Sequence, residues 1–287
     1  MRFIRLLVAV IAVAALAACN SSKEPSVKEK GAVTATTDFV RHFGPAPSVE
    51  KGTAFAFVIY FPSAKEPGRV IPFPFFSFDQ ASLQKVALLK LIGGLGDMKS
   101  YQGEVSQPFP QGVRVLDVVQ SKGVVTVNFS KELGNAKTGP LSRQDVVNAL
   151  QLTLKQFKGV SRVAFQVEGK DVAPGKRADE SAVVQLSAPR LLSVTAMKDK
   201  GAASVEEVDV FFDRPVQIRE LKITGTDGKP YLGDIYQSVF DMAAVVKVKD
   251  QGQFQPGKPV NVRWSVTDNL GRNGSGQREV MLELKEH

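Results

Sequence analysis

The sequence is poor in the side chains that most often carry chemistry or cross-links. Its 287 residues include one cysteine, one tryptophan and two histidines, His42 and His287. A single thiol cannot form a disulfide within the chain, so packing must stabilise the folded part. Catalytic triads need a histidine held by the fold, and copper or zinc sites need paired imidazoles or thiolates. We therefore predict no catalytic residue, no metal site and no cofactor.

The lone cysteine ends a segment that is typical of exported proteins. Two arginines precede an apolar run over residues 6–17, which is shorter than the roughly 20 residues that a membrane-spanning helix needs. The residues that close this run, Leu16-Ala17-Ala18-Cys19, resemble the lipobox of bacterial lipoproteins. This resemblance implies a signal peptide over residues 1–18, cleavage between Ala18 and Cys19, and a lipid on Cys19 that anchors the mature protein to a membrane.

The residues after Cys19 indicate where the anchor would place the protein. Asn20 follows the cysteine, and by resemblance to Gram-negative lipoproteins a residue other than aspartate there implies the outer membrane, with the protein facing the periplasm. Residues 20–37 are rich in Ser, Thr, Lys and Glu, a composition that does not fold alone. We predict a flexible tether over residues 19–50.

Basic residues are concentrated in the middle of the chain. Residues 51–172 hold 15 basic and 9 acidic side chains, whereas residues 189–287 hold 14 of each. Such an asymmetry favours an acidic partner for the middle region, although a merely solvated surface would show the same excess. Because export excludes nucleic acid as the usual partner, the remaining candidates are lipid headgroups, cell-wall carboxylates and an envelope protein.

The first half of the middle region contains two strand patterns. Residues 53–61 alternate phenylalanines with smaller side chains, the period of a half-buried strand. Residues 70–78 form a second extended segment that contains Pro72 and Pro74. Because proline has no N–H to donate, this segment is predicted to be an edge strand or a polyproline-like segment.

Two helices and three further strands are predicted in the rest of this region. A helix capped by Asp79 ends at Gly93-Gly94, and a capping-box pattern at Ser142 and Asp145 begins a second helix that ends at Gly159. Strand patterns lie over residues 113–119, 124–129 and 163–167.

A family resemblance rests on six stretches and on their order. These are Val58-Ile59-Tyr60-Phe61, Leu88 to Gly94, Pro110-Gln111-Gly112-Val113, Val125 to Ser130, Leu152-Thr153-Leu154-Lys155-Gln156-Phe157 with Gly159-Val160, and Phe165 to Lys170. Together they resemble the GerMN (sporulation and spore germination) domain. The resemblance implies an exported α/β domain without known catalytic residues, similar in topology to ring-building motifs, which makes a homo-oligomer one of the expected assemblies.

The C-terminal region shows strand patterns and no helix pattern. Turn signals stand at Asp227-Gly228 and Asn273-Gly274, and Trp264 is a candidate core residue of an antiparallel, immunoglobulin-like sandwich. The expected strands cover residues 191–197, 205–212, 218–224, 239–248, 260–267 and 278–284.

Two stretches of this region carry a second resemblance. Val208 to Val216, and Pro256-Gly257 followed by Val262 to Asp268, are similar to the CopC-like copper-resistance sandwich. The copper site does not carry over, because this chain has Asp268-Asn269-Leu270 where that family has Asp-Gly-His.

Two surfaces of the middle domain are candidates for contact with a partner. One is a polar ridge on the second helix, expected to face water and tipped with positive charge. Its positions are Gln144, Asn148, Gln151, Lys155 and Lys158. The other is the apolar edge over residues 73–78, with Phe73 and Phe75, whose contact with a partner would be insensitive to salt.

The sequence predicts an α+β chain with an α/β GerMN-like domain followed by an all-β sandwich. The expected domain boundaries are 51–172 and 188–287, with a linker over residues 173–187. We expect a non-enzymatic envelope lipoprotein that binds or organises a protein complex or the cell wall. Two alternatives stay open: a peptidoglycan-associated enzyme or enzyme cofactor protein that uses carboxylates, and a periplasmic carrier of apolar ligands.

Overall fold

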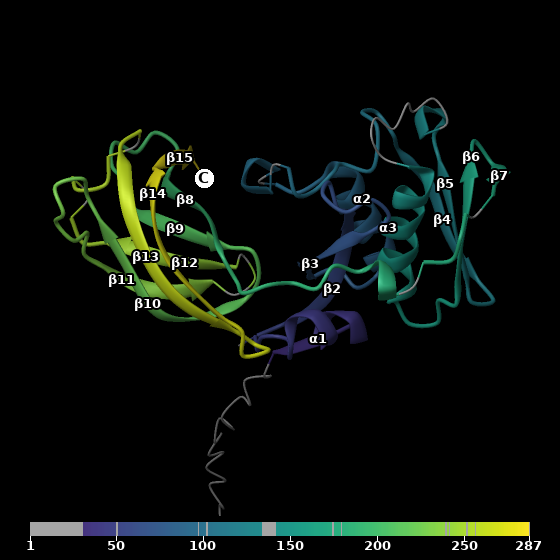
Figure 1. The fold of residues 1–287 in the computed structure, drawn as a ribbon, viewed down its shortest axis with the longest axis horizontal. Helices are drawn as coiled ribbons and strands as arrows, with labels where there is room; N and C mark the ends of the chain where they lie inside the picture. Colours follow the sequence, from purple (N-terminus) through teal and green to yellow (C-terminus); the bar gives the residue numbers. More distant parts are fainter. Residues whose placement is uncertain are drawn as a thin grey trace, which may run out of the picture.

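Two domains stand side by side along the longest axis of the molecule (Figure 1). The computed structural model describes residues 31–286, apart from residues 50, 97, 102, 134–141, 174, 179, 239, 241, 251 and 256. The predicted cleavage and lipidation site, Ala18 and Cys19, lies outside the described residues. Each domain has its own apolar core, and the α+β fold class predicted from the sequence is confirmed.

The α/β domain begins with a three-stranded sheet. It contains β1 (Ala32–Ala35), β2 (Thr53–Pro62) and β3 (Val70–Ser77) in the order β1-β2-β3, with β1 parallel and β3 antiparallel to β2. Pro72 and Pro74 lie on β3, which occupies the edge of this sheet as their missing N–H groups predict.

A second sheet forms the opposite side of the α/β domain. It contains β4 (Val115–Ser121), β5 (Val124–Phe129), β6 (Arg162–Val167) and β7 (Lys170–Val172) in the order β4-β5-β6-β7. Helices α2 (Leu83–Gly93) and α3 (Arg143–Lys155) lie between the two sheets (Figure 1). Short 3-10 turns at Met98–Tyr101, Lys131–Leu133 and Glu180–Ala182 complete the connections.

The helix ends follow the sequence signals with two exceptions, the first being that α3 ends at Lys155, before the expected end at Gly159. Ser142 and Asp145 form the predicted capping box at the start of α3, and Gly94, with a φ of 81°, ends α2. Asp79 does not cap α2. Its carboxylate accepts from the Ala81 N–H at 2.9 Å in the turn before the helix, and Ser82 occupies the N-cap position.

Residues 32–43 are folded, which corrects the expected tether over this part of residues 19–50, whereas residues 19–30 lie outside the described residues. After β1 comes α1 (Thr37–Phe43), capped by Thr36, whose hydroxyl accepts from the Phe39 N–H. Phe39 and Phe43 are buried in the core of the α/β domain. The polar composition around them concealed two aromatic anchors at i, i+4 spacing on one helix face.

Side chains of α3 complete the hydrogen bonding of β2. Beyond the end of β1, the Tyr60 N–H donates to Thr153 Oγ1 at 3.1 Å and the Val58 N–H donates to Gln156 Oε1 at 2.8 Å. The Thr36 hydroxyl also donates to Gln156 Oε1 at 2.9 Å. β3 pairs with one side of β2 along this stretch, but β1 has already ended on the other side. The Leu-Thr-Leu-x-Gln-Phe stretch therefore satisfies the backbone groups on the side of β2 that has no neighbouring strand.

The second domain is a two-sheet β-sandwich. One sheet has the order β10-β13-β14 and the other has the order β11-β12-β9-β8-β15. The strands are β8 (Leu191–Lys198), β9 (Glu207–Phe212), β10 (Val216–Thr224), β11 (Gly233–Ser238), β12 (Ala243–Val248), β13 (Pro259–Asp268), β14 (Asn273–Met281) and β15 (Glu283–Glu286).

Three sequence expectations for the sandwich are wrong. Asn273-Gly274 starts β14 instead of making a turn, because Gly274 lies against Pro189, where an added Cβ would come within 2.0 Å of the Pro189 carbonyl oxygen. Trp264 is only half-buried and packs on Gly276 at the margin of the core. The exposed strand β11, whose burial pattern has no apolar face, was not predicted.

Candidate functional site

The polar positions of α3 that were expected to face a partner are largely covered by the chain itself. Asn148 and Gln151 are only 5% and 4% exposed. Asn148 Nδ2 donates to the Gly68 carbonyl oxygen at 2.9 Å, and Gln151 Oε1 accepts from the Ala178 N–H at 2.8 Å. The prediction that these two side chains face water is wrong, because the connection between β2 and β3 binds Asn148 and the chain after β7 binds Gln151.

The remaining ridge positions divide into covered and open ones. Gln144 exchanges two hydrogen bonds with the backbone of Lys176, and Lys155 is half-buried with Nζ 3.5 Å from the Ala178 carbonyl oxygen. Lys158, beyond the end of α3, is exposed as predicted. Residues 175–178 of the expected linker are thus docked on the α/β domain, while the side chains of Lys176 and Arg177 remain exposed.

The apolar edge over residues 73–78 faces the second domain in part. Phe73 is 7% exposed and packs on Phe61 and Tyr101, so the expectation of an open contact surface is wrong at this position. Phe75 is half-buried beneath Lys90, whose Nζ is 5.2 Å from the ring centroid. Further along the strand, the rings of Phe76 and Phe78 lie 5.0 and 5.4 Å from the ring of Phe240 in the sandwich.

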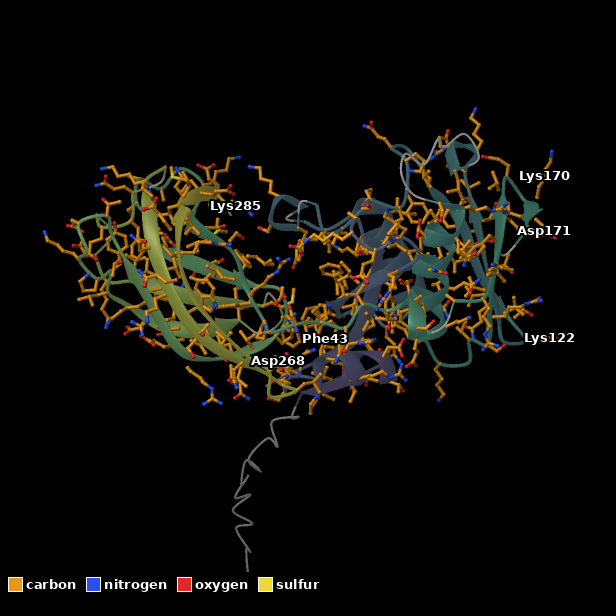
Figure 2. The ribbon with its side chains drawn as sticks, in the orientation of Figure 1. Phe43, Lys122, Lys170, Asp171, Asp268 and Lys285 are labelled. Atoms are coloured by element: carbon orange, nitrogen blue, oxygen red, sulfur yellow. The ribbon has the colours of Figure 1, made fainter. Side chains whose placement is uncertain are left out.

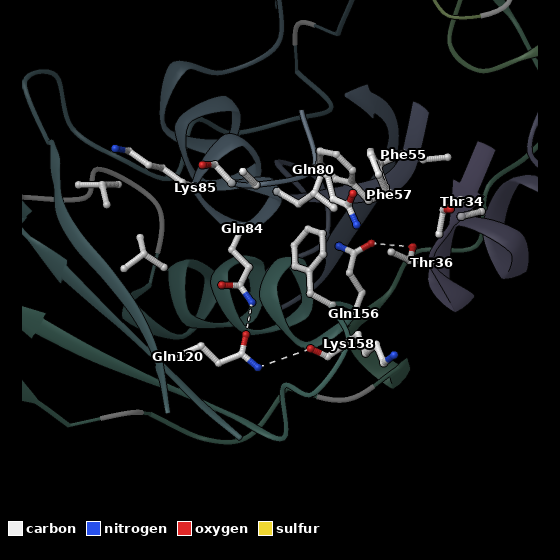
Figure 3. Close-up of a pocket in the computed structure, with 18 of the residues that line it drawn as sticks. Thr34, Thr36, Phe55, Phe57, Gln80, Gln84, Lys85, Gln120, Gln156 and Lys158 are labelled. Carbon is white, nitrogen blue, oxygen red and sulfur yellow. Dashed lines mark hydrogen bonds between the residues drawn. The ribbon is translucent and has the colours of Figure 1, made fainter. Parts of the chain in front are cut away.

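A groove on the α/β domain gathers four glutamines, and we name it the amide groove. Its volume is about 890 Å³, and it is lined by residues 34–37, 55–57, 80–85, 115–118, 120 and 156–158. Gln80, Gln84, Gln120 and Gln156 contribute side chains to it (Figure 3). Four separate segments of the domain meet here: the start of α2, the exposed edge of β4, the end of α3, and β1 with the start of β2.

The hydrogen bonds within the amide groove leave part of its polar capacity unused. Gln84 Nε2 donates to Gln120 Oε1 at 2.7 Å, and Gln120 Nε2 lies 3.5 Å from the Lys158 carbonyl oxygen (Figure 3). A primary amide offers two donors and one acceptor oxygen, so both glutamines keep further capacity. Gln156 is committed to β2 and α1, as described above. Buried Phe55 and Phe157 supply the apolar floor.

An ionic network joins the two domains, and we name it the junction network. The Arg190 guanidinium binds Glu104 with two bonds of 2.7 and 2.6 Å and lies 5.3 Å from the Tyr101 ring centroid. Glu104 precedes Val105 at the end of a loop of the α/β domain, whereas Arg190 precedes β8 of the sandwich. Bidentate Arg–carboxylate pairs fix orientation as well as distance.

The junction network continues into the sandwich and back to the α/β domain. Asp213 lies between Arg190 and Arg214, and the buried Arg214 also contacts Asp268 at 3.5 Å. Asp268 in turn binds Arg272 at 2.6 Å, and Arg272 donates to the His42 carbonyl oxygen on α1 at 2.9 Å. Figure 2 shows Asp268 close to Phe43 at this junction. None of these residues was predicted from the sequence to connect the domains.

The contact between α1 and the sandwich also requires a glycine. Gly44 has a φ of 78°, and an added Cβ would lie 2.6 Å from the Asn269 carbonyl oxygen. Asn269 Nδ2 donates to the Pro45 carbonyl oxygen at 3.0 Å. His42 is therefore not in a tether but half-buried beside this contact, and burial, the largest cause, holds its pKa below the usual value.

A second hollow, the interdomain cavity, lies between β3 and the sandwich. Its volume is about 620 Å³. Apolar side chains from both domains line it, and Lys90 of α2 and Lys285 of β15 reach its edge. The apolar residues include Phe61, Phe73, Phe75, Leu192, Phe211 and Met242.

The described residues show neither a group of three or more metal-ligating side chains nor a helix long and apolar enough to cross a membrane. The amide groove contains a single carboxylate, Asp117, among its lining residues. The other polar groups that line the groove are mainly amides, hydroxyls and lysine ammonium groups.

Comparison with known proteins identifies the first domain. Residues 58–173 match the Germane family, described as sporulation and spore germination. The first GerMN domain of the sporulation protein GerM from Bacillus subtilis is 23% identical, with a TM-score of 0.35, over 44% of this chain and 94% of that one. The tandem GerMN domains of the same protein are 18% identical, with a TM-score of 0.35, over 62% of this chain and 58% of that one.

The second domain gives a different set of similar structures. CopC from Methylosinus trichosporium OB3b is 20% identical, with a TM-score of 0.24, over 34% of this chain and 97% of that one. The comparison with curated proteins gives no match. The resemblance to GerMN seen in the sequence is confirmed by the match of residues 58–173 to the Germane family model, which spans less than half of the chain.

Proposed function

We propose that this chain is a non-enzymatic module of the cell envelope, anchored by a lipid on Cys19, that binds the cell wall through the amide groove. The observation that carries the proposal is the convergence of glutamine amides on an open groove of about 890 Å³ in the Germane domain. Lys85 and Lys158 stand at the same groove and are exposed. They supply the positive charge that the sequence concentrates in this domain.

The chemistry of the amide groove matches that of a peptidoglycan strand. Glycan chains present hydroxyl and acetamido groups that both donate and accept, and a primary amide is the neutral side chain that does the same. The peptide stems carry carboxylates, for which Lys85 and Lys158 are suitable partners. An apolar floor beneath polar walls is the usual composition of a ligand site.

The anchor would place this groove close to a membrane. Thr34 and Thr36 line the groove, so it lies where the tether enters the folded domain. About a dozen residues separate Cys19 from β1, and such a segment spans at most roughly 40 Å when fully extended. The domain would then reach wall strands near the membrane surface and not beyond.

Sedimentation with purified peptidoglycan sacculi tests the proposal. The double variant Gln80→Ala, Gln84→Ala should bind sacculi at least about fivefold more weakly, because two amide partners worth roughly 0.5–1.5 kcal/mol each are removed. Gln217→Ala is the matched control, since Gln217 is an exposed glutamine of the sandwich.

The salt dependence of binding to sacculi distinguishes the contribution of the glutamine amides from that of the lysines at the groove. Lys85→Gln with Lys158→Gln should weaken binding at low salt and lose this effect as salt rises, because exposed charges are screened. Equal retention of the wild type, the glutamine variant and the lysine variant on sacculi would contradict the proposal.

A further inference from the structure

We propose that the interdomain cavity is a second binding site, which takes a small amphipathic ligand: one acyl chain that ends in an anionic group. The cavity has a volume of about 620 Å³ and lies on a domain boundary. Small-molecule sites are commonly found at such boundaries, with volumes of about 300–1,000 Å³. This site is separate from the amide groove and does not depend on cell-wall binding.

Both walls of the cavity are apolar. Phe61, Phe73 and Phe75 come from β2 and β3, and Leu192 and Met242 come from the sandwich. Such a wall favours a hydrocarbon chain by the apolar area removed from water. A polar ligand would lose its hydrogen bonds to water there and gain few in return.

Contacts beside the cavity hold its walls apart. On one side, the paired Glu104 and Arg190 bridge the domains above Tyr101. On the other side, Phe240 packs on Phe76 and Phe78. With the domains fixed at both places, the two walls are held apart and the space between them stays open to a ligand.

Two lysines give the cavity a positive edge that the protein does not neutralise. Within the described part of the chain, neither Lys90 nor Lys285 has a carboxylate within ion-pair distance, although Lys90 lies over the Phe75 ring. Lys285 lies on β15 (Figure 2). The one carboxylate among the lining residues, Asp213, is already bound by Arg214 at 2.7 Å. An anionic head group complements this edge.

Displacement of a fluorescent fatty acid measures the binding. The mature chain from residue 19 onward, with Cys19→Ser so that it carries no lipid of its own, is titrated with cis-parinaric acid below its micelle-forming concentration. Palmitate, a lysophosphatidylglycerol and hexadecanol then compete for the site. The first two share the proposed chemistry and distinguish a free fatty acid from a single-chain phospholipid, while the alcohol has the chain without the charge.

Saturable binding is expected, with either anionic competitor about tenfold stronger than hexadecanol, the factor that a charge-assisted hydrogen bond contributes. Whichever anionic competitor is stronger identifies the source of the ligand. The double variant Lys90→Gln, Lys285→Gln should remove this tenfold preference and leave hexadecanol unchanged. Lys85→Gln, on the same helix but at the amide groove, is the matched control and should have no effect.

Filling the cavity tests the location of the site. Leu89 lines the cavity and is 50% exposed, so Leu89→Trp can occupy its mouth without disturbing the core. This variant should weaken all three competitors at least tenfold while its circular dichroism and thermal unfolding stay like those of the wild type, which shows that it is folded. Absence of saturable binding by the wild type, or binding that neither Leu89→Trp nor the lysine variant changes, would overturn the proposal.

Discussion

The amide groove and the interdomain cavity are similar in size and opposite in construction. The amide groove, about 890 Å³, is built by the Germane domain alone and is walled by amides, hydroxyls and lysines. The interdomain cavity, about 620 Å³, has apolar walls contributed by both domains. A change at the domain junction should therefore abolish the cavity and spare the groove, whereas a change inside the Germane domain should affect the groove first.

Of the variants proposed, Arg214→Ala should show the largest difference between its effect on the interdomain cavity and its effect on the amide groove. Arg214 is 2% exposed and binds both Asp213 and Asp268, so Arg214→Ala removes the cation that the two carboxylates share and leaves them only Arg190 and Arg272 as partners. Breaking a buried ion pair from one side costs about 3–5 kcal/mol. Urea unfolding should show this loss in the sandwich, and fatty-acid binding should disappear while binding to sacculi persists.

The control for this prediction is an exposed ion pair of the same domain. Arg263 is 61% exposed and pairs with Glu220 at 3.6 Å. Arg263→Ala should cost no more than about 1 kcal/mol. If Arg214→Ala and Arg263→Ala lower the free energy of unfolding equally, the junction network does not stabilise the sandwich.

A substitution at Thr153 tests what one buried hydrogen bond contributes to the stability of the domain that holds the amide groove. Its fully buried hydroxyl accepts from the Tyr60 N–H, and Thr153→Val keeps the shape but removes the acceptor. A buried N–H left without a partner costs about 1–3 kcal/mol. Thermal unfolding should show this loss, and Thr153→Ser, which keeps the hydroxyl, should lose clearly less. Equal losses would mean that packing, not the hydrogen bond, explains the buried threonine.

Substitutions in the ion pair of Glu104 and Arg190 test whether this pair holds the two domains together, and we expect a smaller loss of stability. Both side chains are about one-third exposed, so solvent weakens the pair and Glu104→Arg should cost about 1 kcal/mol. Hydrogen exchange near Tyr101 and Leu192 should speed up in this variant. Adding Arg190→Glu should restore the slow exchange, because the reversed pair can form again. If the double variant exchanges as fast as the single one, the pair does not hold the domains.

The smallest expected effect concerns pH. Burial, and to a lesser degree the charges of Arg41 and Arg272, lower the pKa of His42 against the opposing effects of Asp38 and Glu180. The unfolded chain therefore binds this proton more readily, and the free energy of unfolding falls as the pH drops from the usual histidine pKa of about 6.5 through the lowered one. His42→Gln should reduce this fall in urea titrations, and an unchanged pH profile would contradict the assignment.

Local patterns predicted the elements of both domains well. The alternation over residues 53–61, the prolines of β3 and the capping box at Ser142 each depend on neighbours in sequence, and they appear in the structure as β2, an edge strand and the start of α3. The expectation that β2 is only half-buried is wrong, because both of its faces are covered. Pattern reasoning failed where a distant segment decides the outcome. Gly274 was assigned to a turn because its contact with Pro189 lies outside any local window.

Contacts between distant segments, which local patterns do not reveal, decide even more of the candidate site than of the fold. A helical period correctly aligned Asn148 and Gln151, but it could not show that Gly68, between β2 and β3, binds the first and Ala178 the second. The amide groove collects Gln80, Gln120 and Gln156 from segments far apart in the chain, so no spacing rule links them. Only Lys158 was both predicted for a partner surface and found at the groove.

Nuclear magnetic resonance on the isotope-labelled mature chain tests the central claim most directly. Soluble peptidoglycan fragments are added, and the shifts of backbone amide signals are followed. The account predicts shifts concentrated at residues 80–85 and 115–118 and at Lys158, with the strands of the sandwich unchanged. Shifts confined to the sandwich or to the interdomain cavity, or no shifts at saturating fragment, would contradict the claim that the Germane domain binds the cell wall through its amide groove.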